Sequence, residues 1–293
     1  MWARRQEYAL DISEPALART AKNRPTIREL LERYGQTISV KKRGASQERY
    51  VIQALNRTFF ADYPVDKVSG GDLARHRDER LKTVKPGTVR RELALLRHCL
   101  EIARREWGIP IGRNPFLDIK LPSPGEGRDR RLEKHELELV RNGLRYCRAW
   151  YLPPLVELAI ETGMRRGELL ELQWSHIDLE RRIAFLPMTK NGRSRKVPLT
   201  VQAVQILTGL RPRRKGRVFP VNSCAARQSW DRLMKRCGIS DLRFHDLRHE
   251  AISRFFERGL SVPEVAVISG HRSYTMLFRY THIRAEDIVR KLN

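Results

Sequence analysis

The chain has 293 residues, enough for two domains of ordinary size. Its 58 lysine and arginine residues outnumber its 34 aspartate and glutamate residues, which gives a formal net charge of +24 at pH 7. The sequence has no apolar run of membrane-spanning length, no signal peptide and no lipidation motif, so we expect no membrane partner. The basic residues are mostly arginine and are spread over the whole chain, which favours a surface that follows phosphate groups.

The cysteines are scattered and lack the paired C-x-x-C spacing of structural zinc sites. Reduced thiols in a cytoplasmic protein are the simplest explanation. The sequence also has no acidic constellation typical of a metal site and no glycine-rich phosphate-binding loop. We therefore expect neither a metal nor another cofactor.

The first part of the chain is predicted to be helical after a short arm, residues 1–25, which carries several charges and little periodicity. Apolar residues at helical spacing then predict four helices, at about 27–34, 46–60, 71–81 and 86–107. In the second helix, Tyr50 is expected to face the core. The fourth carries outward basic side chains: Arg90, Arg91, Arg97, Arg104 and Arg105. We interpret 26–118 as a helical domain that grips a DNA duplex.

A proline- and glycine-rich stretch at 122–127, followed by a charged run, indicates a flexible linker that we place at 119–128. Residues 129–293 then form a second domain. Two domains joined in this way could close around DNA from both sides. Helical patterns follow, and Gly163 is expected to end one helix and turn the chain sharply into the next.

An arginine marks the start of that next helix. Arg165, Leu169 and Leu172 are predicted to share its core-facing side, with Glu168 beside Arg165 at i+3. An ordinary ion pair with Glu168 would explain the arginine. The same pair would equally hold the guanidinium in position for an external anion.

Residues 177–200 change to strand character around Asn191-Gly192, a strong signal for a β-hairpin. Lys190 lies at the mouth of this turn, from which a long side chain can reach into a cleft. Most hairpin lysines are merely solvated, so Lys190 alone indicates little. A basic loop follows at 211–217, and we interpret Arg213 and Arg214 as phosphate contacts.

A second arginine on an apolar face occurs in the helix predicted at 244–256. Arg248 falls within the apolar stripe, whereas His249 lies on the opposite side and His245 lies at the edge. A buried arginine is unfavourable unless an anion meets it, either a carboxylate elsewhere in the chain or a ligand. Downstream, His271 follows a helix stop, and Tyr280 ends a short helix.

These residues suit phosphoryl transfer. Two arginines can hold the non-bridging oxygens of a phosphodiester and stabilise the charge of the transition state. A tyrosine, whose ordinary pKa is about 10, needs such a cationic setting or an adjacent base to attack. A lysine can protonate the leaving alkoxide, and histidines can donate to the phosphate or handle the tyrosine proton.

In order along the chain, the motifs Thr-Gly-Met-Arg165-x-x-Glu168-Leu, Thr-Lys190-Asn-Gly with Val-Pro-Leu, His245-Asp-Leu-Arg248-His, Gly-His271 and Arg-Tyr280-Thr-His resemble those of the tyrosine recombinases, the phage integrase family. Each motif is weak singly, but the ordered set over 129–293 is highly specific. The region 26–118 resembles, less sharply, the helical core-binding domain of such enzymes.

The resemblance implies a mainly α fold of two domains: a helical core-binding (SAM-like) domain and an α+β catalytic domain with a small antiparallel sheet. It implies that Tyr280 is the nucleophile and forms a 3′-phosphotyrosyl bond, that Arg165 and Arg248 bind the scissile phosphate, and that Glu168 supports Arg165. Lys190 would be the general acid, with His245 and His271 assisting, and no metal or ATP is needed.

The resemblance further implies double-stranded DNA with paired recombination sites as the partner, a homotetramer on that DNA, a tail after Tyr280 that docks on a neighbouring subunit, and in some systems a DNA-bending accessory protein. Such enzymes act in the prokaryotic cytoplasm, on the nucleoid. About 25 residues at the N-terminus cannot form the separate arm-binding domain of many integrases. A resolvase of the Xer type and an integrase of a minimal element therefore both stay open.

Three other interpretations compete. A type IB topoisomerase or protelomerase would share the chemistry, although the size and pattern are closer to an integrase. A non-catalytic DNA-binding remnant would show the same charge, although the catalytic set is intact. A metal-dependent nuclease or transposase would be blocked by a chelator.

Overall fold

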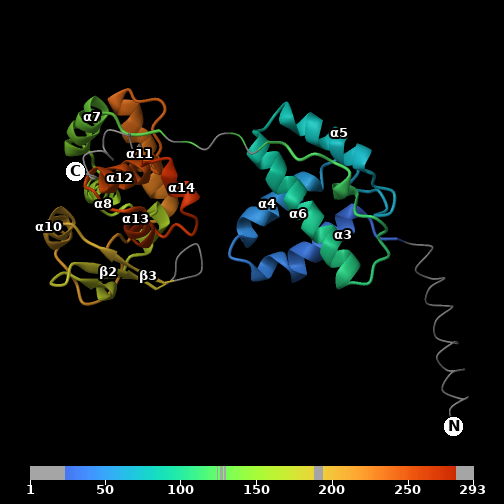
Figure 1. The fold of residues 1–293 in the computed structure, drawn as a ribbon, viewed down its shortest axis with the longest axis horizontal. Coiled ribbons are helices and arrows are strands. Elements are labelled where there is room, and N and C mark those ends of the chain that lie inside the picture. Colours follow the sequence, from blue (N-terminus) through green and yellow to red (C-terminus); the bar gives the residue numbers. More distant parts are fainter. Residues whose placement is uncertain (1–23, 124, 126–127, 129, 188–193, 282–293) are drawn as a thin grey trace, which may run out of the picture. The chain divides into compact units, whose positions relative to one another are not determined.

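The computed structural model describes residues 24–123, 125, 128, 130–187 and 194–281. The chain divides into two compact units, Met1–Gly127 and Arg128–Asn293, and each is described by itself (Figure 1). The predicted arm 1–25 lies almost entirely outside the described residues, as do Lys190 and the tail that follows Tyr280 beyond residue 281.

The first unit is a bundle of helices in which α6 is the longest element (Figure 1). Its elements are α3 (Ile27–Thr37), η1 (Ser39–Lys41), α4 (Ala45–Leu55), α5 (Gly70–Leu81), α6 (Pro86–Arg105) and η2 (Pro115–Leu117). Local sequence explains where they begin. Thr26 and Ser69 each form a capping box with an acidic residue three positions later, and Pro86 occupies the first turn of α6, where its missing N–H is tolerated.

The core of this unit is built from the apolar faces of α3 and α6. Leu30, Leu93 and Leu96 are fully buried there. The prediction that Tyr50 faces the core is wrong, because its side chain is 72% exposed. Ile52 and Leu55 form the inward face of α4. Tyr50 precedes Ile52 by two positions, which is about 200° around the helix, so its side chain points to the opposite, outer face.

The stretch after η2 packs on the first unit. Ile119 and Leu121 contact its core, and the carbonyl oxygens of Lys120 and Pro122 accept hydrogen bonds from Arg77 (2.7 Å) and Arg90 (2.6 Å). The predicted linker at 119–128 therefore begins, in its first residues, as a segment held against the helical unit.

The second unit combines helices with a small sheet that lies at one side of them, next to α13, Val262–Ser269 (Figure 1). Its elements are α7 (Lys134–Arg145), α8 (Leu152–Thr162), α9 (Arg166–Glu171), η3 (Trp174–His176), β1 (Ile177–Asp178), β2 (Ile183–Leu186), β3 (Arg195–Pro198), α10 (Val201–Gly209), α11 (Ser223–Cys237), α12 (Asp246–Glu257), α13 (Val262–Ser269) and α14 (Thr275–Phe278). The strands are antiparallel in the order β1-β2-β3, with Ile183 opposite Pro198 and Leu186 opposite Arg195. The predicted fold class is confirmed, and so is the pairing of the two strands of the hairpin.

Two helices, α8 and α12, pack against each other in the middle of this unit (Figure 1). Helix α8 is apolar on most of its surface, and its side chains from Leu152 to Thr162 are largely buried. It ends at Gly163, whose φ of 61° lies in the left-handed region, as predicted. A side chain there would also meet the ring of Phe255 on α12 at 3.3 Å, so glycine allows the close approach of the two helices.

Among the residues described, none of the helices has both the length and the apolar character required to cross a bilayer.

Candidate active site

Arg248 is the most unusual buried residue of the second unit. Its side chain is 3% exposed, and its guanidinium donates hydrogen bonds to the carbonyl oxygens of Gly163 (2.6 Å) and Ser269 (2.7 Å). These carbonyls terminate α8 and α13, so the negative ends of two helix dipoles face the arginine. Within the described part of the chain, no carboxylate forms a salt bridge with Arg248, which leaves the predicted carboxylate partner without support.

The charge around Arg248 is not balanced. Its pKa is lowered to about 9, first by burial and then by the charge of Arg165, whereas Glu168 acts in the opposite direction. The guanidinium stays protonated at neutral pH, but its surroundings favour an additional negative charge. An arginine with free donor positions in such surroundings is suited to binding an oxyanion.

Arg165 lies at the start of α9 as its N-cap residue. Its backbone N–H and its guanidinium both donate to Glu168, each at 2.8 Å. The prediction that Arg165, Leu169 and Leu172 share one helical face is wrong in detail, because α9 begins after Arg165 and ends before Leu172. The sharp turn at Gly163 leaves Arg165 extended, with its side chain about one-fifth exposed.

Glu168 is shared by a second arginine that the sequence analysis did not identify. Arg195, at the start of β3, donates from both terminal nitrogens to the two oxygens of Glu168, at 2.9 and 2.8 Å. It also donates to the carbonyl oxygen of Ile268 at 3.0 Å. Burial alone would raise the pKa of Glu168, but these hydrogen bonds, with those from Arg165, lower it to about 2. Glu168 is therefore ionised and holds both arginines in place.

A signal for Arg195 was present in the sequence. Side chains alternate along a strand, so Arg195 lies on the same face of β3 as Val197, which is fully buried. A charged residue on the buried face of a strand needs a partner, just as Arg248 does on its helix.

His271 is tied to the same helix end as Arg248. Its Nδ1 is 2.7 Å from the hydroxyl oxygen of Ser269, whose carbonyl oxygen accepts from Arg248. Burial, then the charges of Arg248 and Arg165, lower the pKa of His271 to about 4, so its ring is neutral at pH 7. A neutral imidazole held at Nδ1 leaves its Nε2 to contact a ligand.

His245 precedes α12, and its ring meets that of His249 edge to face, with centroids 5.3 Å apart. One edge of His245 is open to solvent. Burial of the rest of the ring, together with the neighbouring positive charges, lowers its pKa below the ordinary value.

Tyr280 is buried to 7% exposure against the polar side of α12. Its hydroxyl forms a short hydrogen bond with Nδ1 of His249, and the two rings are stacked with centroids 5.6 Å apart and an interplanar angle of 29°. The sequence predicts His249 on the side of the helix opposite the apolar stripe. In the structure, the segment after α14 covers that side. The sequence did carry a signal, because His245 and His249 are four residues apart and therefore lie on the same face of the helix.

The structure thus brings together Arg165, Glu168, Arg248 and His271 at the ends of α8, α9 and α13. Residues of α12 join this cluster to His245 and Tyr280. Lys190 lies outside the described residues, on the connection that leads into β3. The cluster can hold an anion, present a phenol to it and keep neutral imidazoles beside both.

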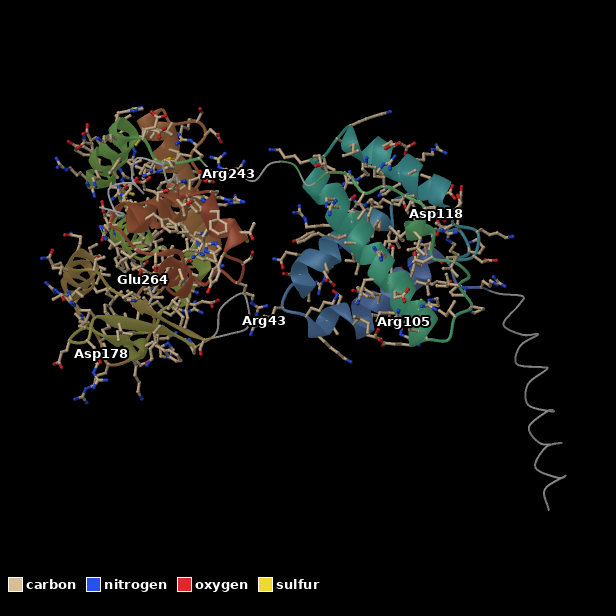
Figure 2. The ribbon with its side chains drawn as sticks, viewed as in Figure 1. Arg43, Arg105, Asp118, Asp178, Arg243 and Glu264 are labelled. Atoms are coloured by element: carbon tan, nitrogen blue, oxygen red, sulfur yellow. The ribbon has the colours of Figure 1, made fainter. Side chains whose placement is uncertain are left out.

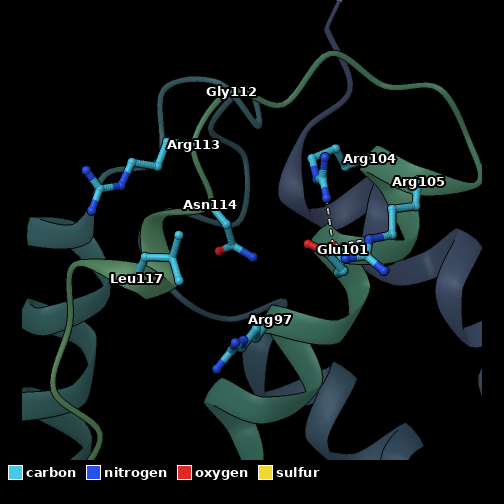
Figure 3. A pocket seen from close by; sticks show the side chains of 8 residues that line it. All are labelled: Arg97, Glu101, Arg104, Arg105, Gly112, Arg113, Asn114 and Leu117. Atoms are coloured by element: carbon cyan, nitrogen blue, oxygen red, sulfur yellow. Dashed lines mark hydrogen bonds and ion pairs between the residues drawn. The ribbon is translucent and has the colours of Figure 1, made fainter.

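The basic residues predicted to contact DNA are not equivalent. Arg97, Arg104 and Arg105 line a hollow of about 470 Å³ together with Arg113, and Arg104 pairs with Glu101 at 2.8 Å (Figure 3). Figure 2 shows Arg105 at the end of α6. Arg90 is half-buried through its bond to Pro122. The others are exposed: Arg91, Arg97, Arg104, Arg105, Arg213 and Arg214.

Comparison with known proteins identifies the family and the fold. The sequence pattern of the phage integrase family matches residues 130–287. The chain is 44% identical to a shufflon-specific DNA recombinase of Escherichia coli, over 92% of this chain and 73% of that protein. It is 26% identical to the tyrosine recombinase XerA of Saccharolobus solfataricus, over 82% of this chain and 74% of that protein.

Solved structures share the fold. A lambda integrase dimer bound to a COC′ core site has a TM-score of 0.74 at 22% identity, covering 89% of this chain and 97% of that one. The integrase of the transposon Tn1549, in complex with transposon right-end DNA, has a TM-score of 0.74 at 17% identity, covering 92% of this chain and 98% of that one. From the family match and the relatives together, the chain belongs to the phage integrase family and is a tyrosine recombinase, a DNA strand-transferring enzyme.

Proposed function

We propose that this enzyme cleaves and rejoins DNA at specific sites through a covalent 3′-phosphotyrosyl bond to Tyr280. The observation that carries the assignment is Arg248, a buried guanidinium whose pKa is lowered to about 9 and whose helix also contacts the hydroxyl of a buried tyrosine. A phosphodiester would supply the missing negative charge beside Arg248 and, in the same place, the electrophile for Tyr280.

Each residue of the cluster has a role in this reaction. Arg248 and Arg165 hold the non-bridging oxygens of the scissile phosphate, and Glu168 orients Arg165. The oxygen of Tyr280 bonds to phosphorus as the bond to the 5′-oxygen breaks, and Lys190 protonates that leaving oxygen. His271 and His245 assist beside the phosphate. Cleavage of a second strand frees its own 5′-hydroxyl. That hydroxyl then attacks the phosphotyrosine and releases Tyr280.

The partner is double-stranded DNA that carries paired recombination sites. Support comes from the net charge of +24 and from the identity to a shufflon-specific DNA recombinase. We place the DNA-gripping domain at 26–118 and the catalytic domain at 129–293. The active assembly is a homotetramer on DNA, by analogy with the lambda integrase tetramer bound to a Holliday junction. A DNA-bending protein acts as an accessory factor at some sites, and the enzyme acts in the prokaryotic cytoplasm, on the nucleoid.

Covalent trapping tests this proposal. The protein is incubated with fragmented genomic DNA in the presence of a chelator, denatured and examined for protein-linked DNA. The wild type should form an adduct and Tyr280→Phe should form none. Sequencing the attached DNA then identifies the site. Tight binding without an adduct, on nicked substrates that carry the bound sequence, would exclude the catalytic assignment and leave a DNA-binding protein. An adduct that persists in Tyr280→Phe would exclude the assigned nucleophile.

A further inference from the structure

The hydroxyl of Tyr280 must lose a proton when it attacks phosphorus, and the roles assigned so far leave that proton without an acceptor. The ordinary pKa of a tyrosine is about 10, so the phenol is almost fully protonated at pH 7. Positive charge at the phosphate favours the phenolate, yet an adjacent base removes the proton more effectively in the transition state. A base for this step has to lie within hydrogen-bonding distance of the phenol oxygen.

His249 meets that requirement in the structure. Its Nδ1 makes a short hydrogen bond to the hydroxyl of Tyr280, and the stacked rings fix the relative orientation of the two groups. His249 follows Arg248 directly along α12, so the phosphate-binding guanidinium and the imidazole are carried by one rigid element. The side chain is half-buried, and burial lowers its pKa below the ordinary value of about 6.5.

The charges that face His249 come from three segments. Asp246 raises its pKa, whereas Arg248 from the same helix and Arg279 and Arg128 from neighbouring segments lower it. The titratable and charged groups around it are Asp246, His245 and Arg248 on α12, His271 after α13, Arg279 and Tyr280 after α14, and Arg128 before α7. Burial and the arginines together outweigh Asp246. The ring is therefore neutral at pH 7, with a lone pair available at Nδ1 when its proton is on Nε2.

We propose that His249 is the general base of strand cleavage, and this inference rests on the proposed function of Tyr280. The O–H bond of Tyr280 breaks and its proton passes to Nδ1 of His249, as the phenol oxygen bonds to phosphorus. The bond from phosphorus to the 5′-oxygen breaks, and the 5′-oxygen takes a proton from Lys190. In rejoining, the 5′-hydroxyl attacks phosphorus and gives its proton back to the neutral amine of Lys190. The bond from phosphorus to the phenol oxygen breaks as the imidazolium of His249 returns its proton to that oxygen.

The other histidines are less well placed for this step. Nδ1 of His271 is engaged with the hydroxyl of Ser269, whose carbonyl oxygen accepts from Arg248, and this contact places His271 beside the arginine. His245 meets the edge of the His249 ring, so it is one ring further from Tyr280. Among the three, His249 is the histidine whose hydrogen bond to the phenol oxygen is observed.

The test measures the rate of adduct formation on a nicked duplex that carries the site found by covalent trapping. At pH 7, His249→Gln should be slowed on the order of 10²-fold, the lower range for loss of a general base. His176→Ala serves as the control, because His176 is also half-buried and packs edge to face on Phe185, away from this cluster. DNA binding by both variants should match that of the wild type.

The pH profile separates a base from a group that only positions the tyrosine. The wild-type rate should fall as the pH drops through the pKa of His249, below about 6.5, and should be flat above it. The rate of His249→Gln should instead keep rising with pH toward the ionisation of the phenol near pH 10. Parallel profiles for the two proteins would overturn the proposal, even if the variant is slower throughout.

A more acidic phenol provides a second readout. Replacing Tyr280 with 3,5-difluorotyrosine by nonsense suppression reduces the need for a base. The replacement should increase the rate of adduct formation far more in the His249→Gln variant than in the protein that keeps His249. Equal acceleration in both backgrounds would overturn the proposal. Because the wild type and Tyr280→Phe are run alongside, failure of the wild type to form an adduct would count against the proposed function, whereas an active wild type with an equally active His249→Gln would count only against His249.

Discussion

Arg165 and Arg248, which we propose bind one phosphate, are held in different structural positions. Arg248 is fixed by carbonyl oxygens at two helix ends and is almost inaccessible to solvent, whereas Arg165 is the N-cap of α9 and is held through Glu168. We expect overall affinity for DNA to be distributed over many other basic side chains, because the chain has 58 lysine and arginine residues. Binding and chemistry should therefore be separable at single residues.

Arg165→Ala should lower the cleavage rate on the order of 10²-fold or more, because it removes a donor aimed at charge that develops in the transition state. Equilibrium binding of the same duplex should change little. Arg165→Lys should restore only part of the rate, since a single ammonium group cannot form paired bonds to the phosphate. The neighbouring Arg166→Ala, which removes a bond to Ser223, is the control. Loss of binding equal to the loss of cleavage would contradict the role given to Arg165.

Lys190→Ala should cleave slowly because the 5′-oxygen leaves without a proton. A substrate with sulfur in place of that bridging oxygen has a better leaving group and should restore the rate. Lys196→Ala is the control, because Lys196 is an exposed lysine on β3. Its cleavage rate should match that of the wild type on both substrates. If the sulfur substrate does not rescue Lys190→Ala, the general acid is another residue.

At the scale of elements, Glu168 and Arg195 join three segments that each carry part of the site. Arg195 belongs to β3, which follows the connection bearing Lys190. It bonds to Glu168 on α9 and to the carbonyl oxygen of Ile268 on α13, just before His271. The side chain of Arg195 is only 9% exposed. This bridge aligns the hairpin with the two helix ends.

The pH dependence of stability tests that bridge. The pKa of Glu168 is depressed to about 2 in the folded chain, from an ordinary value of about 4.3 in the unfolded chain. Its stabilising effect is therefore complete above the unfolded value and is lost as the pH falls through the folded value. Glu168→Gln should be less stable than the wild type at pH 7, and the difference should shrink between about pH 4 and pH 2.

Thermal unfolding of the catalytic unit at pH 7 and pH 3 measures this difference. Glu264→Gln is the matched control, because Glu264 is also the third residue of a helix with a capping box in the same unit but is exposed. The control should lose about 1 kcal/mol or less of stability, as expected for an exposed cap. A stability difference for Glu168→Gln that does not change with pH would contradict the ionised bridge.

Elements with local signals were predictable from the sequence. Gly163 ends α8 in the left-handed region, Ser261 forms its capping box with Glu264, and the strands flanking Asn191-Gly192 pair as a hairpin. Each depends on residues within a few positions of one another. The partners of Arg248, Glu168 and Tyr280 are 85, 27 and 31 residues distant along the chain, and periodicity alone cannot specify such contacts.

At the scale of the whole molecule, the sequence indicated a basic surface but not which arginines are already engaged. Arg90 bonds to Pro122, and Arg104 pairs with Glu101, so neither presents a wholly uncommitted guanidinium. The Arg90 contact depends on how the segment after η2 folds back on α6, whereas Arg104 and Glu101 are neighbours at i,i+3 on the helix itself. Arg97 lines two adjoining hollows on this helix, which makes it the better candidate for a phosphate contact.

Salt dependence of DNA binding distinguishes these arginines. Arg97→Gln should reduce the slope of log affinity against log salt by about 1, because one phosphate contact and its released counterion are lost. Arg28→Gln is the control, since Arg28 already forms paired hydrogen bonds to Asp62 at 2.6 and 3.0 Å. An unchanged slope for Arg97→Gln would place the DNA elsewhere on the helical unit.

Removing the negative charge of the scissile phosphate tests most directly whether Arg248 binds that charge. A nicked substrate is made with a methylphosphonate at the scissile position, which removes the negative charge while keeping the leaving group. Arg248→Ala should fail to form the Tyr280 adduct on the phosphodiester but should form it on the methylphosphonate. Equal failure on both substrates, with DNA binding intact, would contradict the role of Arg248 as the partner of the phosphate.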